Sequence, residues 1–418
     1  MSSAGSRSFA MVSKGDEMAG ILEGLKVIEM GHFIAVPSAG AIFADWGADV
    51  IKVEPPDGEA FRGFKTLLLK TAGAELNWRF EVHNRNKRSM GINLKNEAGR
   101  EILLRLVRDA DVFMSNYEHG VMQALKLGYA DLSRDNPKLI YALITGYGTV
   151  GPDKDERGFD FAAAWARSGI QYLIGEPGSA PPQQRGGMMD RTAGAHMVAG
   201  ILAALYHREK TDQGQELEFS LYHTGIWTIA ADYQVALGGV PLTQNDRTRA
   251  RNPLWNNYQA KDGRWLQMAM LQADLSWSDF CRAIERPDLE NDPRFAIMDE
   301  RGQHCEELIR TLDEVFSARD MAEWETRLRE NNCIFGRITS PEEVLSDPQA
   351  EANHFFQEID HPEAGRMKFV TTPVTFHQNP ASIRTTSPEA GQHTEEILLE
   401  LGYDWDAIER LKDQKAII

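Results

Sequence analysis

The chain has 418 residues, of which 42% are hydrophobic and 26% charged, and its formal net charge is −17. This length predicts about two domains, and the composition is that of a globular protein rather than a disordered or fibrous one. The negative charge argues against nucleic acid and against an anionic membrane as partners, because both require a basic surface. Any anionic ligand must therefore be held by a local basic patch.

The termini and the cysteines indicate a cytoplasmic protein. Residues 1–20 are rich in Ser, Gly and charge and lack the apolar run of a signal peptide, which predicts a flexible tail. The longest apolar stretch, Met197 to Leu205, is far shorter than the roughly 20 residues of a membrane span. Cys281, Cys305 and Cys333 form no CxxC or Cys/His pattern, so neither a disulfide framework nor a zinc site is predicted.

From Leu25 the sequence alternates between strand and helix patterns. LKVIEM reads as a strand, AVPSAGAIFADWGA as a helix and DVIKVE as a strand; NEAGREILLRLVRDA is helical, and DVFMSN and LIYALITGYG are buried strands. A basic stretch, HNRNKRSMGINLK at 83–95, interrupts this order. The alternation predicts an α/β fold, in which a Rossmann-like parallel sheet is covered by helices and the ligand crevice lies at the carboxyl ends of the strands.

The second half of the chain changes character. A long helix from Thr192 to Lys210 and the strand GQELEFSL continue the first pattern, whereas the sequence after Gly238 is turn-rich, with Asp262-Gly263 predicting a hairpin. We therefore expect a large Rossmann-like domain at 21–224 and a smaller α+β domain at 225–350. Residues 351–418 are predicted to return and complete the large domain.

The common cofactor motifs are missing. The first turn, GHFIAVPSAG, lacks the GxGxxG of dinucleotide-binding enzymes, and the chain has no GxxxxGK[ST], HExxH or GxSxG. A nicotinamide-dependent dehydrogenase, an NTPase, a zincin and a serine hydrolase are therefore not favoured. No metal is expected.

Three groups of residues are candidates for a site, and each has a plainer interpretation. The basic stretch gathers Arg85, Lys87, Arg88 and Lys95, which could hold phosphates or form a solvated loop. Asp190 precedes a helix of small residues, where an anion is favoured, but Asp also commonly caps a helix. Asp160 lies in a similar setting, and the aromatic residues Trp255, Tyr258 and Trp265 could line a pocket or build a core.

Several stretches, in one order, resemble the formyl-CoA and carnitine CoA-transferase family, the class III CoA-transferases of the CaiB/BaiF type. They are LEGLKVIEMGHFIAVPSAG, ADWGADVIKVEPP, NRNKRS with INLK, SNYEHGVM, ITGYG, MMDRTAG, LAALYHREKTDQGQ and a final helix ending in LGY. The resemblance runs from Leu22 nearly to the C-terminus. It implies a CoA-transferase acting on an acyl-CoA and an organic acid, an interlocked homodimer, and no cofactor beyond CoA as the thioester substrate.

The resemblance also implies roles for individual residues. Asp190 becomes the catalytic nucleophile: its ionised carboxylate attacks the thioester carbonyl, and an aspartyl-CoA thioester follows through a mixed anhydride. Asp160, Trp255 and Tyr258 are expected in the substrate pocket. The expected CoA contacts are Phe33, Ile34, Ala35, Arg88, Ile92, Lys95, Asn116 and Tyr117.

Two departures from the family pattern bear on specificity. Asn116-Tyr117-Glu118-His119-Gly120 stands where the family often has Asn, an aromatic residue, Arg or Lys, and Pro-Gly, which puts a cationic CoA contact in doubt. The glycine-only loop of formyl-CoA transferases has no match between Gly239 and Trp265, so a larger organic acid than oxalate or formate is expected.

Two alternatives stay open. An α-methylacyl-CoA racemase shares the fold, but its Gly-His-Asp triplet reads Gly158-Phe159-Asp160 here, and phenylalanine cannot move a proton. A CoA-binding protein without catalysis would bind its ligand equally well after Asp190→Ala. A transferase would lose turnover through that change and still bind CoA.

Overall fold

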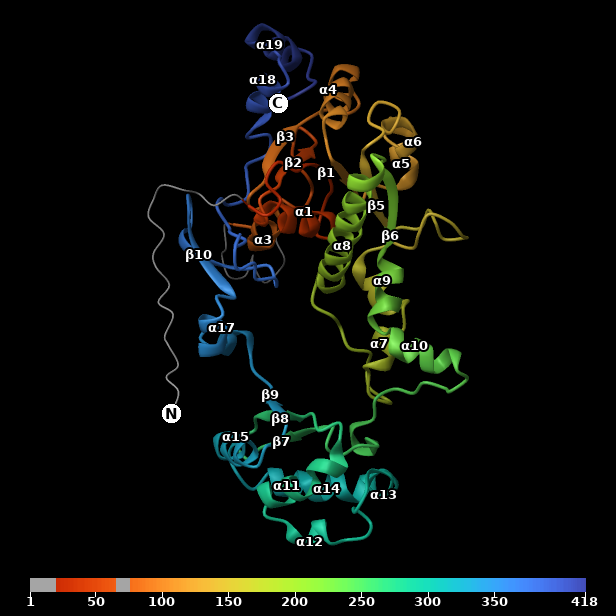
Figure 1. Ribbon diagram of the computed structural model, residues 1–418, viewed down its shortest axis with the longest axis vertical. Helices are drawn as coiled ribbons and strands as arrows, with labels where there is room; N and C mark the ends of the chain where they lie inside the picture. Colours follow the sequence, from red (N-terminus) through yellow and green to blue (C-terminus); the bar gives the residue numbers. More distant parts are fainter. Residues whose placement is uncertain (1–19, 65–75) are drawn as a thin grey trace. The chain divides into compact units, whose positions relative to one another are not determined.

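The structure, a computed structural model, describes residues 20–64 and 76–418 (Figure 1). The tail predicted at 1–20 therefore lies, except for its last residue, outside the described residues. Two compact units can be distinguished. The first contains the described residues up to 168 together with 184–228 and 354–418, and the second contains 169–183 and 229–353. The second unit thus takes in residues 169–183, which the sequence pattern placed in the large domain.

The first unit is built on a parallel sheet, as the strand and helix alternation predicts. Its six strands, within the described residues, run in the order β3-β2-β1-β4-β5-β6, and every neighbouring pair is parallel. The order reverses between β1 and β4, and at such a point the connections leave on opposite sides and open a crevice. The strands are β1 (Lys26–Met30), β2 (Asp49–Glu54), β3 (Arg88–Gly91), β4 (Val112–Ser115), β5 (Ile140–Thr145) and β6 (Gln215–Ser220).

Helices of the first unit pack on this sheet, and the C-terminal segment takes part. Ile397, Leu398 and Ile408 are buried in the same core as residues of β1, β2 and β4, and Ile417 forms a bridge with Ile92. The helices are α1 (Ala35–Asp45), α3 (Trp78–Asn84), α4 (Glu97–Arg108), α5 (His119–Leu125), α6 (Tyr129–Leu132), the π-helix η1 (Phe161–Ala166), α8 (Met188–Thr211), α9 (Leu221–Thr228), α18 (Thr394–Glu400) and α19 (Trp405–Asp413); β10 (Phe356–His361) and β11 (Gly365–Val370) form a hairpin.

Helices α1 and α8 approach each other closely. A Cβ added to Gly194 of α8 would lie 2.9 Å from the Ala35 carbonyl oxygen and 2.9 Å from Ser38 Cβ, both in α1. Only a residue without a side chain fits at this contact. The first turn of α1 is thereby held beside the second turn of α8.

The second unit has its own aromatic core around a small antiparallel sheet. The predicted hairpin at Asp262-Gly263 is confirmed, and Gly263 has the positive φ of 81° that such a turn requires. The elements are α7 (Ile170–Leu173), α10 (Ala230–Leu237), the 3-10 helix η2 (Arg247–Arg249), β7 (Asn257–Gln259), β8 (Trp265–Met268), α11 (Ala273–Ala283), α12 (Pro287–Glu290), α13 (Met298–Gln303), α14 (Cys305–Phe316), α15 (Met321–Glu330), β9 (Phe335–Arg337), α16 (Pro341–Val344) and α17 (Pro348–Ala352). In the described part of the chain, no helix combines the length and apolarity needed to cross a membrane.

Candidate active site

A pocket of about 520 Å³ opens at the carboxyl ends of β1, β4 and β5 in the first unit. Its walls come from the turn after β1, the turn after β4, the end of β5, residues 154–159 and the first turn of α8. This is the crevice expected where the strand order reverses. The pocket brings together six of the residues predicted for the site: Phe33, Ile34, Ala35, Asn116, Tyr117 and Asp190.

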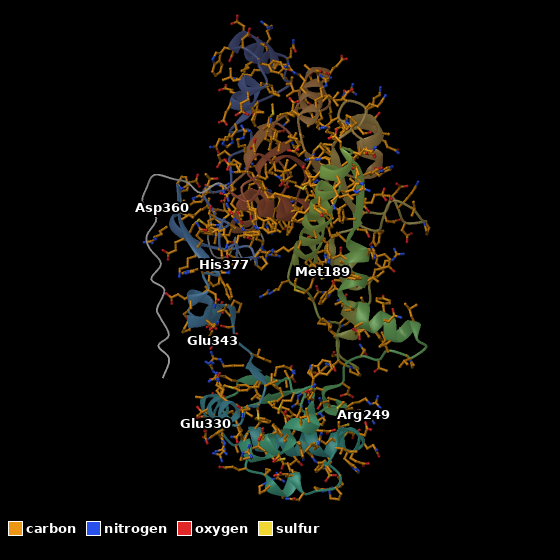
Figure 2. The ribbon with its side chains drawn as sticks, viewed as in Figure 1. Met189, Arg249, Glu330, Glu343, Asp360 and His377 are labelled. Atoms are coloured by element: carbon orange, nitrogen blue, oxygen red, sulfur yellow. The ribbon has the colours of Figure 1, made fainter. Side chains whose placement is uncertain are left out.

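Asp190 lies within the first turn of α8 and does not cap it. The helix begins at Met188, earlier than the predicted Thr192, and its N-cap is Gly187 at φ 75° with no side-chain cap. Figure 2 labels Met189, the residue before Asp190, at this helix start. The helix-cap interpretation of Asp190 is therefore wrong. The carboxylate faces the pocket instead.

The electrostatics of the site raise the pKa of Asp190 well above that of an ordinary carboxyl. Burial and the neighbouring charge of Asp160 raise the pKa of Asp190 to about 7, and the Arg191 guanidinium opposes this rise. Because a carboxyl in this range exchanges its proton near neutral pH, Asp190 is available as an anion without being permanently charged. Perturbed pKa values of this kind are common at functional sites.

Asp160 is buried behind the pocket rather than in its lining. Its side chain is 2% exposed, and burial raises its pKa, opposed by hydrogen bonds from the backbone N–H groups of Phe161, Gly187 and Met189. Two of these amides belong to the start of α8, where helix N–H groups lack partners within the helix. Asp160 thus accepts from backbone N–H groups at the start of α8, which is the capping role considered for Asp190.

The turn after β4 is tied to the turn after β1 by a reciprocal pair of hydrogen bonds. The Asn116 side chain donates from Nδ2 to the His32 carbonyl oxygen at 2.8 Å, and its Oδ1 accepts the His32 N–H at 3.0 Å. The His32 and Tyr117 rings stand edge to face, with centroids 5.1 Å apart. The amide group of Asn116 is therefore engaged with the protein itself, and Tyr117 is left to face a ligand.

The basic stretch at 83–95 is not the solvated loop that charge suggested. Arg88 belongs to β3, and Arg85 and Lys87 are buried. Each is paired within the protein: Arg85 with Asp45 at 2.7 Å, Lys87 with Glu29 at 2.7 Å, and Arg88 with Asp49 at 2.6 Å and with Glu396 and Glu400. These cations are therefore engaged with carboxylates of the protein itself, and a CoA contact through Arg88 stays a prediction.

The other predicted contacts are not among the residues that line this pocket. Ile92 is 1% exposed in the core beside Ile417, which leaves its side chain no face for a ligand. Lys95 is exposed on a separate surface hollow with Asn96 and Arg100. In the second unit, Trp255 is 62% exposed, whereas Tyr258 is fully buried and donates its hydroxyl to the Pro253 carbonyl oxygen. A substrate role for Trp255 or Tyr258 stays a prediction.

The sequence reasoning missed two cations at the pocket wall. Lys154 and Arg157 are the Lys and Arg side chains that line it within the described residues. Arg157 pairs with Glu118 at 3.2 Å, the residue that stands where the family often has a cation. The segment DKDERGFD, which ends at Asp160, contains both cations, but its mixed charges do not indicate which side chains face a ligand.

The fold is thus that of an α/β protein with a parallel sheet, and its pocket lies at the reversal of the strand order, where proteins of this class commonly bind ligands. The model of CoA-transferase family III matches residues 22–394. The chain belongs to this family, and it is an enzyme that moves CoA from an acyl-CoA thioester to a free carboxylic acid.

Named relatives agree with this family. The chain is 36% identical to (R)-2-hydroxy-4-methylpentanoate CoA-transferase of Clostridioides difficile, over 95% of this chain and 99% of that protein. It is 33% identical to cinnamoyl-CoA:phenyllactate CoA-transferase of Clostridium sporogenes, over 95% and 97%. A CAIB/BAIF family protein from Brucella suis has a similar crystal structure, with a TM-score of 0.78, 28% identity, and coverage of 92% and 100%.

Proposed function

We propose that Asp190 is the nucleophile and that CoA is carried as an aspartyl-CoA thioester. The observation that supports this is the place of Asp190 in the pocket, among the residues for which the resemblance implied CoA contacts. A carboxylate in a partly dehydrated pocket is a better nucleophile than one in water, because less hydration must be removed. No described group of three or more His, Cys, Asp or Glu side chains could hold a metal.

The proposed reaction balances without a net proton. An Asp190 oxygen attacks the donor thioester carbon, the C–S bond breaks, and CoA leaves as a thiolate. The thiolate then attacks the Asp190 carbonyl of the mixed anhydride, which releases the donor acid as a carboxylate. The acceptor carboxylate repeats these two steps in reverse, taking CoA and restoring the Asp190 carboxylate.

The acyl group that this pocket favours is apolar. The Phe33 and Phe159 rings meet edge to face, with centroids 5.4 Å apart, and Ile34 adds an aliphatic wall. Phe159 is 60% exposed, so its ring is free to cover a bound side chain. The two relatives above are named for substrates with branched or aromatic carbon skeletons. We therefore assign the acceptor to carboxylic acids with a branched or aromatic side chain.

Lys154 and Arg157 are proposed to hold CoA phosphates. They are exposed side chains on the pocket wall, whereas the cations of the basic stretch are paired internally, Lys95 excepted. Ion pairs between exposed side chains contribute little to stability, so the Glu118 to Arg157 pair is easily exchanged for a pair with phosphate. The segment 154–159 would then close over the pantetheine arm.

The deciding experiment is a panel of acyl-CoA donors against free acids, read by mass spectrometry, with a search for a CoA adduct on the peptide that contains Asp190. We expect exchange with branched and aromatic acids and an adduct on Asp190. Asp190→Asn should abolish exchange and retain CoA binding by calorimetry. Exchange that continues without this adduct contradicts the nucleophile. Deuterium entering the α-carbon without exchange would indicate the racemase instead.

The proposed assembly is a cytoplasmic homodimer. The family likeness suggests it, and one chain has a mass of 46.9 kDa. Light scattering is expected to give about twice that mass in dilute neutral buffer. A mass equal to one chain would contradict the proposal.

A further inference from the structure

The turn between β1 and α1 has an unusual backbone. Phe33, which lines the pocket, has a φ of 60°, in the left-handed region that residues with a side chain rarely adopt. Such a conformation persists only where the surroundings hold it, and it is often found at binding and catalytic sites. Something in the protein must therefore select it over the ordinary conformations.

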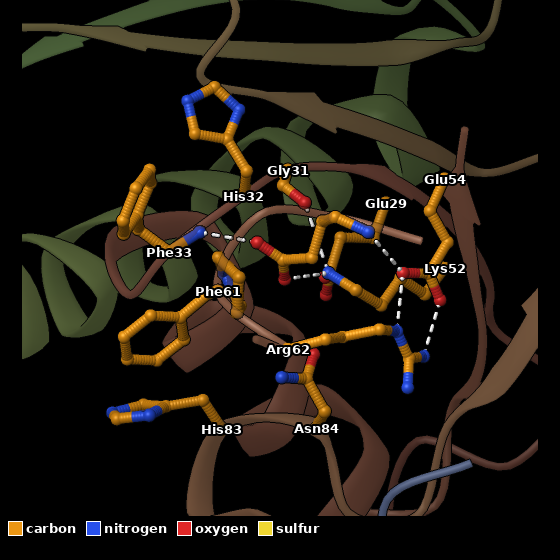
Figure 3. A network of polar contacts seen from close by, with 12 residues as sticks. Glu29, Gly31, His32, Phe33, Lys52, Glu54, Phe61, Arg62, His83 and Asn84 are labelled. Atoms are coloured by element: carbon orange, nitrogen blue, oxygen red, sulfur yellow. Dashed lines mark hydrogen bonds and ion pairs between the residues drawn. The ribbon is translucent and has the colours of Figure 1, made fainter. Parts of the chain in front are cut away.

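Buried charged side chains hold the two ends of this turn (Figure 3). Glu59 Oε2 accepts the Phe33 N–H at 2.8 Å, and Lys52 Nζ donates to the Gly31 carbonyl oxygen at 3.0 Å. Between them, the backbone of His32 is bound by Asn116. Every one of these turn groups is thus engaged by a side chain from another segment.

The Glu59 carboxylate is itself fixed from several sides. It is 5% exposed, Lys52 lies 2.8 Å from its Oε1, and the Glu59 N–H donates to Glu54 Oε2 at 3.0 Å. Lys52 also pairs with Glu29 at 3.1 Å, and Glu29 with Lys87 at 2.7 Å. Burial acts to lower the pKa of Lys52, but Glu59, Glu29 and Glu54 outweigh it and raise that pKa, so the ammonium stays charged.

A contribution to stability does not explain this network. Replacing a buried ion pair by apolar side chains of similar volume is often neutral or stabilising, because the desolvation of the charges offsets their attraction. A charged acceptor does, however, give a shorter and stronger hydrogen bond to a backbone N–H than a neutral one. The network therefore holds the Glu59 carboxylate, a strong acceptor, in place for the Phe33 N–H.

We propose that Glu59 is a positioning residue for the transferase reaction, which holds the substrate-facing turn at Phe33 in its left-handed conformation. Through that turn it places the Phe33 ring against Phe159 and sets the first residues of α1 beside Asp190. Loss of the bond lets Phe33 relax to an ordinary conformation and turns its ring out of place. The inference rests on the proposed function of the pocket.

The test compares Glu59→Gln, Glu59→Ala and the double variant Glu59→Ala with Lys52→Met. The glutamine oxygen can still accept the Phe33 N–H, so Glu59→Gln should lower kcat by no more than about 5-fold. Glu59→Ala should lower kcat about 30- to 100-fold and change KM for the acyl-CoA by less than about 3-fold, because the proposed phosphate contacts, Lys154 and Arg157, are unchanged. The double variant restores the charge balance but also removes the Lys52 bond to Gly31, so its Tm should recover only in part while kcat stays low.

Two outcomes overturn the proposal: wild-type kcat in Glu59→Ala, or recovery of both Tm and kcat in the double variant, which would show a purely structural role. Glu81→Ala is the matched control, since Glu81 is a buried carboxylate that accepts the Ser387 N–H at 3.1 Å outside the pocket lining. It should lower Tm and leave kcat unchanged. Trapping the Asp190 adduct in the wild type separately tests the proposed function.

Discussion

Asn116 makes two opposed hydrogen bonds to the backbone of a single residue, His32, and so joins the ends of β1 and β4. Asn116→Ala removes both bonds and leaves the His32 N–H and carbonyl without these partners. We expect the free energy of unfolding to fall by about 1 to 2 kcal/mol. We also expect kcat/KM to fall by at least 10-fold, because both pocket turns lose their common anchor. Urea denaturation and steady-state kinetics measure the two effects.

Asn136→Ala is the control for this change. Asn136 also binds the backbone through its side chain, donating to the carbonyl oxygens of Val107 and Ala110, but it does not line the pocket. It should cost a similar amount of stability and leave kcat/KM near that of the wild type. Equal losses of activity in both variants would show that Asn116 acts only through stability.

The pH dependence of catalysis should report Asp190. With a pKa of about 7, the carboxylate forms as pH rises from 6 to 8, and kcat/KM should rise with it. Asp160→Asn removes the adjacent negative charge, so the pKa of Asp190 should fall and the midpoint of the profile should move to lower pH. A profile that is flat over this range, or one that moves to higher pH in Asp160→Asn, is inconsistent with this assignment.

Asp190 should also make the enzyme less stable at alkaline pH. Its pKa is raised from 3.8 to about 7 in the folded chain, so the folded state keeps a proton that the unfolded state releases. The associated stability is complete below pH 4 and is lost as pH rises through 7. At pH 8, Asp190→Asn should therefore be more stable than the wild type by about 1 to 3 kcal/mol. Near pH 4 the difference should shrink, as thermal melts of both proteins can establish.

Arg157→Ala should weaken binding of the CoA substrate and spare the chemistry. We expect KM for the acyl-CoA to rise about 5- to 20-fold, with a steeper loss in low salt, and kcat to stay within about 2-fold. Arg134→Ala serves as the control, because Arg134 is an exposed arginine paired with Asp131 at 2.6 Å and lies outside the pocket lining. If both substitutions leave KM unchanged, Arg157 does not hold phosphate.

Most of the sheet could be predicted from the sequence because β4 and β5 are buried apolar runs, and β1 and β2 keep apolar residues beside their buried charges. β1, β2, β4 and β5 appear where the pattern placed them. β3 was missed, since Arg88 opens it and the preceding charges resemble a loop. The internal partners of those charges, such as Asp45 and Glu29, are distant in sequence, and no local pattern connects them.

The pocket was predicted in part for a related reason. The turns that contain Phe33, Asn116 and Tyr117 follow predicted strands, and the family resemblance implied that these residues contact CoA. The helix start could not be placed from pattern alone, because Gly187 begins α8 through its positive φ, and glycine is equally compatible with a longer loop. Long-range pairs such as Glu59 with Phe33 form only in the folded chain, so no periodic pattern in the sequence indicates them.

Gly194 lies one helical turn beyond Asp190, against Ala35 and Ser38. The spacing between Asp190, the proposed nucleophile, and the turn after β1 therefore depends on the absence of a side chain at Gly194. The methyl group of an alanine there would contact α1 and push the two helices apart. Such a change would disturb the pocket although no residue of its lining is altered.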